Sequence, residues 1–136
     1  MLMSVQYECD ILENRISYRI VGAGIEVHRR LGPGLLERTY AVCLAHELAA
    51  FGFKVSSEAR IPLIYKDLHI ERAFRADLII DDKVLIEIKS VAAIQPIHKV
   101  QVLTYLRLTG LRLGLLMNFN TACLRDGVER VVNGLV

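Results

Sequence analysis

The sequence has no long hydrophobic run, although 53% of its 136 residues are hydrophobic and its mean hydropathy is +0.36. No apolar stretch approaches the roughly 20 residues that a membrane helix needs. The first ten residues, MLMSVQYECD, have no basic region followed by an apolar run, so they do not predict a signal peptide. We therefore expect a cytoplasmic protein with no membrane partner. We interpret the surplus apolar surface as an interface of a homo-oligomer.

Cysteine is scarce and a strong net charge is missing. The three cysteines, Cys9, Cys43 and Cys123, show no metal-ligand spacing, which is typical of reduced, mostly buried thiols in a cytosolic protein. Because 17 Lys and Arg nearly balance 15 Asp and Glu, the net charge is only +2. Nucleic-acid binding usually shows as a strongly basic face, so any basic residues that bind DNA must be arranged locally. Candidates for phosphate contacts are Arg29, Arg30, Arg38, Arg75 and Lys99.

Two common kinds of catalytic site are also missing. Gly32-Pro33-Gly34 lies between two expected helices, so it does not form a phosphate-binding loop after a strand. No Ser/His/Asp arrangement is evident, because Ser90 lacks an obvious base and His28, His46 and His69 follow no functional spacing. The chemistry of this protein must therefore be sought in its carboxylates and lysines.

Hydrophobic periodicity predicts an α/β fold in the order α-α-β-β-β-α-β-β. We expect helices at 13–31, 35–51 and 96–109, strands at 55–64, 69–80, 83–90 and 111–118, and a last strand or turn at 125–132. Pro62 suits an edge strand, and the continuously apolar stretch 111–118 suits a strand buried on both faces. The length predicts a single domain over residues 1–136, with residues 1–10 as a loosely held arm. Such an order favours a mixed β-sheet flanked by helices.

The stretch FRADLIIDDKVLIEIK, residues 74–89, concentrates the candidate chemistry. It predicts a β-hairpin whose second strand is apolar except for Glu87 and Lys89. Side chains alternate between the two faces of a strand, so these two charged groups point to the same side. Burying charge in such a strand is costly unless the charge is paired or binds a metal.

The length of the hairpin turn decides what faces Glu87. A three-residue turn at 81–83 places Asp77 opposite Glu87 and Arg75 opposite Lys89, with opposed Cβ atoms about 4.5–5.5 Å apart. Two carboxylates at that distance repel, so one must be protonated or both must share a cation. Oxygen ligands of this kind suit a hard divalent ion such as Mg²⁺. A two-residue turn would put the two acids on opposite faces and remove the site.

Two of the expected helices carry further candidates. Glu37 lies near the start of the second helix, where the helix dipole favours an acid whatever its function, and Tyr40 follows one turn later. On the third helix, His98, Gln101 and Tyr105 share one face. A Gln and a Tyr one turn apart could reach a backbone phosphate or orient a metal-bound water, but the same face could simply be solvated.

These motifs together resemble a known group of enzymes. Asp77, followed on the next strand by Glu87-Ile88-Lys89, resembles the D…(D/E)-x-K signature of the PD-(D/E)xK nuclease superfamily. The stretch GLLERTY, residues 34–40, is similar to the G-x-x-E-x-x-Y motif of the GxxExxY protein family, a branch of that superfamily. Gln101 and Tyr105 resemble the Q-x-x-x-Y helix of its exonuclease-like members. The resemblance implies a restriction-endonuclease-like fold.

The resemblance, which covers about residues 16–120, also implies roles. Asp77 and Glu87 would hold Mg²⁺ or Mn²⁺, with the Ile88 carbonyl as a further ligand and Glu37 helping directly or through water. Lys89 would position or deprotonate the attacking water. Ala76 stands where the signature has proline, but the acid after it is kept. Gln101 and Tyr105 would steady the nucleic-acid strand, and the full set of candidate nucleic-acid contacts is Tyr40, Arg75, His98, Gln101 and Tyr105.

Two functions from different classes stay open at this point. The first is a metal-dependent nuclease-like enzyme that hydrolyses nucleic-acid phosphodiester bonds, with DNA as the expected substrate. The second is a non-catalytic oligomeric or binding protein that retains the nuclease fold. Small size, near-neutral charge and high apolarity favour the second, whereas the complete set of Asp77, Glu87 and Lys89 favours the first.

Overall fold

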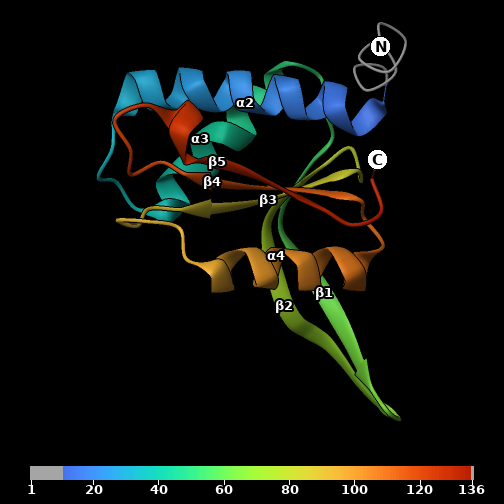
Figure 1. The fold of residues 1–136 in the computed structure, drawn as a ribbon. Coiled ribbons are helices and arrows are strands. Elements are labelled where there is room, and N and C mark those ends of the chain that lie inside the picture. Colours follow the sequence, from blue (N-terminus) through green and yellow to red (C-terminus); the bar gives the residue numbers. More distant parts are fainter. Residues whose placement is uncertain (1–10, 136) are drawn as a thin grey trace, which may run out of the picture.

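The chain folds around one five-stranded sheet with the strand order β1-β2-β3-β4-β5 (Figure 1). The computed structural model describes residues 11–135, so the arm predicted for residues 1–10 lies outside the described residues. The elements are α2 (Leu12–Leu31), α3 (Glu37–Ala50), β1 (Val55–Tyr65), β2 (Leu68–Ile80), β3 (Val84–Lys89), α4 (Pro96–Thr109), β4 (Leu113–Asn118), the 3₁₀ turn η1 (Leu124–Gly127) and β5 (Val128–Val132). The predicted fold class and element order are confirmed.

The sheet is mixed, because β3 and β4 are parallel whereas the other neighbouring strands are antiparallel. A parallel pair needs a long crossover connection, and α4 provides it. Every residue of β4 is buried, as expected for a strand covered on both faces. β1 is an edge strand, as Pro62 predicts, and its register with β2 shifts at this proline, between Ile61 and Leu63.

The helices cover the two faces of the sheet (Figure 1). On one face, residues of α2 and α3 such as Ile20 and Leu44 form a core with Ile86 and Ile88 of β3. On the other face, residues of α4 pack on Leu85 and its neighbours. Alternating residues of β3 therefore enter two different cores, as the period of a strand requires. Within residues 11–135, no helix is both long and apolar enough to cross a bilayer.

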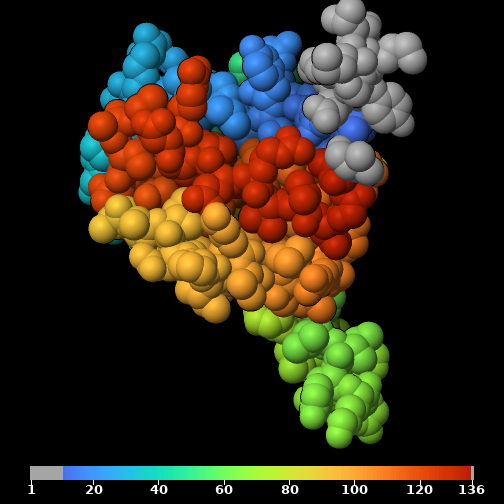
Figure 2. All heavy atoms as spheres, viewed as in Figure 1, coloured from blue at the N-terminus to red at the C-terminus, as the bar shows by residue number. Residues whose placement is uncertain are grey.

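The two strands of the β1–β2 hairpin are longer than the other strands of the sheet. Its outer half extends clear of α4 and of the remaining strands, and Figures 1 and 2 show it as a narrow projection. The apolar side chains near its tip, Ile64, Tyr65 and Leu68, are 64%, 60% and 55% exposed. The inner half of the same hairpin borders the candidate active site.

Candidate active site

The β2–β3 turn has three residues, Asp81–Lys83, and this sets the register of the site. The Lys83 N–H donates to the Ile80 carbonyl at 2.9 Å, and both aspartates of the turn have positive φ, at 52° and 53°. The backbone pairs that follow are Ile80 with Val84, Ile79 with Leu85 and Leu78 with Ile86. One further step along the same register brings Asp77 to Glu87, as the odd-numbered turn predicts.

Asp77 and Glu87 meet at the point where the backbone ladder between β2 and β3 stops. The Asp77 N–H donates to Glu87 Oε1 at 3.1 Å, and the Ile88 N–H donates to Asp77 Oδ2 at 2.8 Å. Each carboxylate thus takes a backbone donor from the opposite strand. Because side chains replace main-chain pairing here, the β2–β3 ladder ends before the expected pair of Arg75 and Lys89, and on the other edge of β2 Arg75 pairs with Arg60 of β1.

Burial and mutual repulsion raise the proton affinity of this pair of acids. Burial, followed by the charge of Asp77, raises the pKa of Glu87 to about 7. Burial likewise raises the pKa of Asp77, and the nearby Glu37 carboxylate acts in the same direction. Lys89 and the backbone N–H groups oppose both shifts. The negative charge of the pair is therefore not fully offset by its neighbours.

Glu37 lies beside this pair at the start of α3. Its Oε1 accepts the Ser90 N–H at 3.2 Å, just past the end of β3, and the Ser90 hydroxyl donates to the Leu35 carbonyl at 2.8 Å. These bonds join the loop before α3 to the carboxyl end of β3. Glu37 is exposed, so its carboxylate borders the buried pair from the solvent side.

Tyr40 has a structural role in this loop. Its ring is fully buried and stacks on Phe119 with centroids 4.4 Å apart. Its hydroxyl donates to the Gly32 carbonyl at 2.5 Å and accepts the Leu35 N–H at 3.1 Å. A side chain with no exposed surface cannot contact a nucleic-acid strand, so the position of Tyr40 does not favour the nucleic-acid contact expected from the sequence.

Lys89 ends β3, next to a buried residue that sequence reasoning missed. The Lys89 carbonyl accepts the Phe119 N–H at 2.9 Å, which continues the contact between β3 and β4. The buried Asn118 accepts the Val91 N–H at 3.1 Å and donates to the Val91 carbonyl at 3.0 Å. Asn118 therefore fixes the chain that leaves Lys89. A polar residue at the end of a wholly apolar strand was the available signal.

Helix α4 brings two of its three candidates to the acids. Tyr105 is 5% exposed and hydrogen-bonded to the exposed Gln101, and burial and the charge of Glu87 raise the pKa of Tyr105. His98 instead caps the helix, because its Nδ1 accepts the Gln95 N–H at 2.9 Å. The Nδ1 atom of His98 thus has its hydrogen-bond partner within the protein and needs no ligand.

Of the five cations considered for phosphate contacts, two lie at the site. Arg38 and Arg75 line a hollow of about 380 Å³ together with Glu37 and Asp77, and Arg75 is 3.6 Å from the Glu58 carboxylate. The other three form ion pairs elsewhere, Arg29 and Arg30 with Glu26 and Lys99 with Glu129. Two arginines thus border the site although the net charge of the chain is small.

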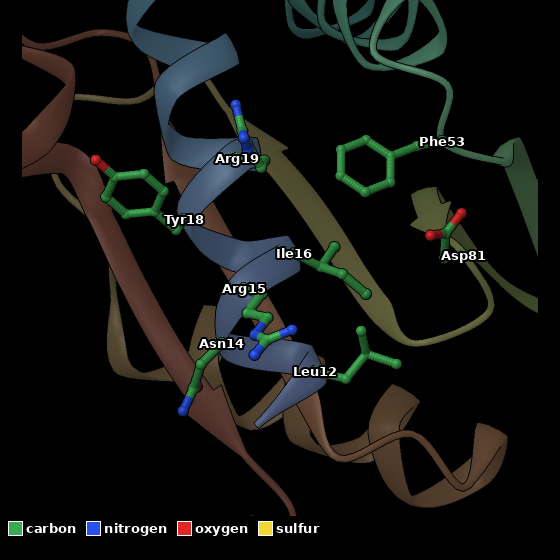
Figure 3. Close-up of a pocket in the computed structure, with 8 residues that line it drawn as sticks. All are labelled: Leu12, Asn14, Arg15, Ile16, Tyr18, Arg19, Phe53 and Asp81. Carbon is green, nitrogen blue, oxygen red and sulfur yellow. The ribbon is translucent and has the colours of Figure 1, made fainter. Parts of the chain in front are cut away.

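A different cavity, of about 720 Å³, lies at the opposite end of β3 (Figure 3). Leu12, Ile16 and Tyr18 of α2 line it together with Phe53, and Asp81 of the β2–β3 turn closes one side. None of the candidate site residues lines this mainly apolar cavity. The candidate chemistry is therefore confined to the carboxyl end of β3.

The donor atoms at the acid pair suit a hard divalent cation. Asp77, Glu87 and Glu37 offer only oxygen ligands, and Mg²⁺ is commonly bound through one or two carboxylates plus water and phosphate oxygens. Within residues 11–135, no group of three or more His, Cys, Asp or Glu side chains is close enough to form a metal cage. The residues present therefore fit a divalent ion held by a pair of carboxylates and not one enclosed by protein ligands.

Comparison with known proteins agrees with this geometry. A sequence model of the PD-(D/E)XK nuclease superfamily matches residues 14–131. Searches of curated proteins and of solved structures found no match. The matched range includes the strands, the acid pair and α4, and it leaves out only short segments at the two ends. The chain therefore belongs to the PD-(D/E)XK nuclease superfamily.

Proposed function

We propose that this protein is a nuclease that uses Mg²⁺ or Mn²⁺ to hydrolyse phosphodiester bonds of DNA. The observation that supports this proposal is the pair of the half-buried Asp77 and the buried Glu87, joined through backbone donors and flanked by Lys89. Two acids held close together and withdrawn from water disfavour the folded state unless a cation offsets their charge. A divalent ion would offset that repulsion.

Each residue of the site has a distinct part in the proposed reaction. Asp77 and Glu87, with the Ile88 carbonyl, would hold the ion, and Glu37 would help directly or through a water molecule. The ion would supply charge stabilisation at the phosphoryl oxygens and a water that loses its proton more readily. Lys89 would position that water or, in its neutral form, take up its proton.

The rim of the site would hold the nucleic acid. Gln101 is exposed and hydrogen-bonded to Tyr105, which lies beside Glu87. This pair would therefore contact the nucleic-acid backbone next to the cleaved bond. Arg38 and Arg75 line the hollow that opens at Asp77 and would contact neighbouring phosphates. The stretch GLLERTY at residues 34–40 supports a place for this chain in the GxxExxY branch.

A cleavage assay separates this proposal from a non-catalytic binding protein. Wild-type protein is incubated with linear and with circular DNA in Mg²⁺ or Mn²⁺, beside the Asp77→Ala and Lys89→Met variants. We expect the Asp77→Ala variant to be inactive. We expect the Lys89→Met variant to be about 10²- to 10⁴-fold slower, the usual contribution of a positioned proton acceptor. Calorimetric titration should show that the wild type binds the metal and that the Asp77→Ala variant does not.

The controls make the assay decisive. Asp126→Ala removes an exposed acid of η1 that does not line the hollow at Asp77, and this variant should cleave like the wild type. Equal degradation by the wild type and the Asp77→Ala variant would point to a contaminating nuclease. A wild type that neither binds the metal nor cleaves either form of DNA would establish the non-catalytic alternative.

We also propose that the protein self-associates. The apolar tip of the β1–β2 hairpin, formed by Ile64, Tyr65 and Leu68, projects into solvent and offers a surface for a second copy of the chain. The surplus of apolar residues in the sequence supports the same proposal.

A further inference from the structure

We infer that the inner half of the β1–β2 hairpin binds the backbone of the substrate strand at a distance from the cleaved bond. This inference rests on the proposed function for the class of ligand, a nucleic acid. Its evidence is a second hollow, of about 850 Å³, whose lining includes Arg60, Arg72 and Arg75. We refer to it as the arginine groove.

The arginine groove is continuous with the candidate active site. Ser57, Glu58 and Arg75 line both this groove and the smaller hollow that contains Asp77 and Glu37. Along β2, Arg72 lies five positions before Asp77, which is about 16 Å of extended strand. A strand whose phosphate lies at Asp77 could therefore run along the hairpin past all three arginines.

The positive charges of the arginines in this groove repel one another. Arg60 and Arg75 are direct partners in the register of β1 and β2, and like charges opposite one another destabilise a sheet. Among the described residues that line the groove, Glu58 is the only acid, and its contact with Arg75 is a long 3.6 Å. Within residues 11–135, neither Arg60 nor Arg72 forms a salt bridge. An anion with repeated charges would relieve this repulsion.

A break in the hairpin brings the third arginine into the groove. Ile61 pairs with Phe74 and Leu63 with Ile70, so three residues of β2 stand opposite the single Pro62. Proline lacks the N–H that a regular ladder needs, and the resulting bulge re-aims the side chains of the longer strand. Arg72 is the middle residue of that bulge, and it lines the same groove as Arg60 and Arg75.

The backbone next to the site is unusual in a second way. Glu58 stands opposite Asp77 in β1, and its φ of 52° is left-handed, which is uncommon for a residue other than glycine. Around this point β2 changes face, because Leu78 packs in the core under α2 and α3 whereas Ala76 packs under α4. The change of face thus lies on β2 between Arg75 of the arginine groove and Leu78 of the core under α2 and α3.

The test measures DNA binding in EDTA, where metal-dependent cleavage cannot occur. Fluorescence anisotropy of labelled 20-nucleotide single strands and 20-base-pair duplexes is recorded between 50 and 200 mM salt. Each lost phosphate contact lowers the slope of log K against log salt by about 0.7 for single strands and about 0.9 for duplexes. We therefore expect Arg60→Ala/Arg72→Ala to lower the slope by about 1.4–1.8 and, at 0.1 M salt, to weaken binding about 25- to 60-fold.

Two matched variants accompany the double alanine variant. Arg125→Ala/Arg130→Ala removes the same charge from exposed residues at the opposite edge of the sheet and should bind like the wild type. Arg60→Lys/Arg72→Lys keeps the charge and should keep the salt slope. If the alanine variant loses the native circular-dichroism spectrum, single Arg60→Gln and Arg72→Gln variants replace it, each with an expected loss of about 0.7–0.9 in slope.

The inference is overturned if the groove variants keep the wild-type slope, if the variant at the opposite edge loses as much, or if the wild type binds no DNA. A wild type that binds DNA with the expected slopes but fails to cleave it in Mg²⁺ would refute the proposed nuclease activity and leave the arginine groove in place. The two failures are thus distinguishable.

Discussion

Glu87 is a buried carboxyl group that faces a second carboxyl group, and this should give the metal-free protein a distinctive pH dependence. Its folded pKa of about 7 lies above the ordinary value of 4.5, so the folded state binds more protons between these pH values. Stability should therefore be highest at low pH within this window and fall as the pH rises through about 7. At about 1.4 kcal/mol per pKa unit, the upper limit of this loss is about 3 kcal/mol.

Urea unfolding in EDTA at pH 5 and pH 8 would measure this effect. The Glu87→Gln variant should lose less stability over this range than the wild type, because its side chain no longer ionises. Glu71→Gln removes an exposed acid of the hairpin and should retain the wild-type pH dependence. Parallel pH profiles for wild type and Glu87→Gln would show that Glu87 is not the titrating group.

The residues of the acid pair could be predicted from sequence, whereas several of their neighbours could not. Alternation along a strand and one turn length are local properties, and together they placed Asp77 opposite Glu87. The role of Tyr40 depends on Phe119, and the role of Asn118 depends on Val91. In both cases the partner is distant in the sequence. His98 belongs to a capping box whose first member is Gln95, a residue that the sequence analysis did not pair with it.

At the scale of elements, the loop between α2 and α3 depends on one hydroxyl group. Tyr40→Phe keeps the stacking on Phe119 but removes the bonds to the Gly32 carbonyl and the Leu35 N–H. We expect a loss of about 1–3 kcal/mol in the free energy of unfolding, because the remaining partners are partly buried. Chemical denaturation measures the loss.

The matched control for this change is Tyr18→Phe in α2. The Tyr18 side chain is 80% exposed, so removing its hydroxyl should change stability by no more than about 0.5 kcal/mol. Equal stability of the Tyr40→Phe variant and the wild type would mean that the two loop bonds contribute nothing measurable. The loop would then need another anchor, such as the Ser90 hydroxyl bond to Leu35.

Element bounds followed from periodicity and from the turn residues, but the end of the β2–β3 ladder did not. A regular hairpin with a three-residue turn would pair Arg75 with Lys89, as expected from the sequence pattern. The structure ends the ladder after Leu78 and Ile86, because the carboxylates of Asp77 and Glu87 take the next backbone N–H groups. Side chains that compete for backbone donors cannot be read from hydrophobic spacing.

At the scale of the whole molecule, the composition and the order of the expected helices and strands were enough to predict the fold class, but they did not predict the shape of the molecule. The order α-α-β-β-β-α-β-β, with one strand buried on both faces, indicated the mixed sheet that the structure confirms. The projecting hairpin carries a bulge opposite Pro62 and a change of face near Asp77, and the arginine groove lies along the same stretch of β1 and β2. Both are properties of paired strands, which a single stretch of sequence does not encode.

The projecting hairpin tip should be the surface through which copies of the chain associate. A two-stranded ribbon is marginally stable in water on its own, so covering Ile64, Tyr65 and Leu68 with a second copy would stabilise it. Sedimentation velocity over a range of concentrations should show self-association of the wild type, and Ile64→Ser/Leu68→Ser should shift it toward the monomer. Ile97→Ser/Val100→Ser removes equally exposed apolar groups from α4 and should not. A wild type that stays monomeric at every concentration would refute this interface, and equal shifts by both variants would mean that general apolarity, not the hairpin tip, drives association.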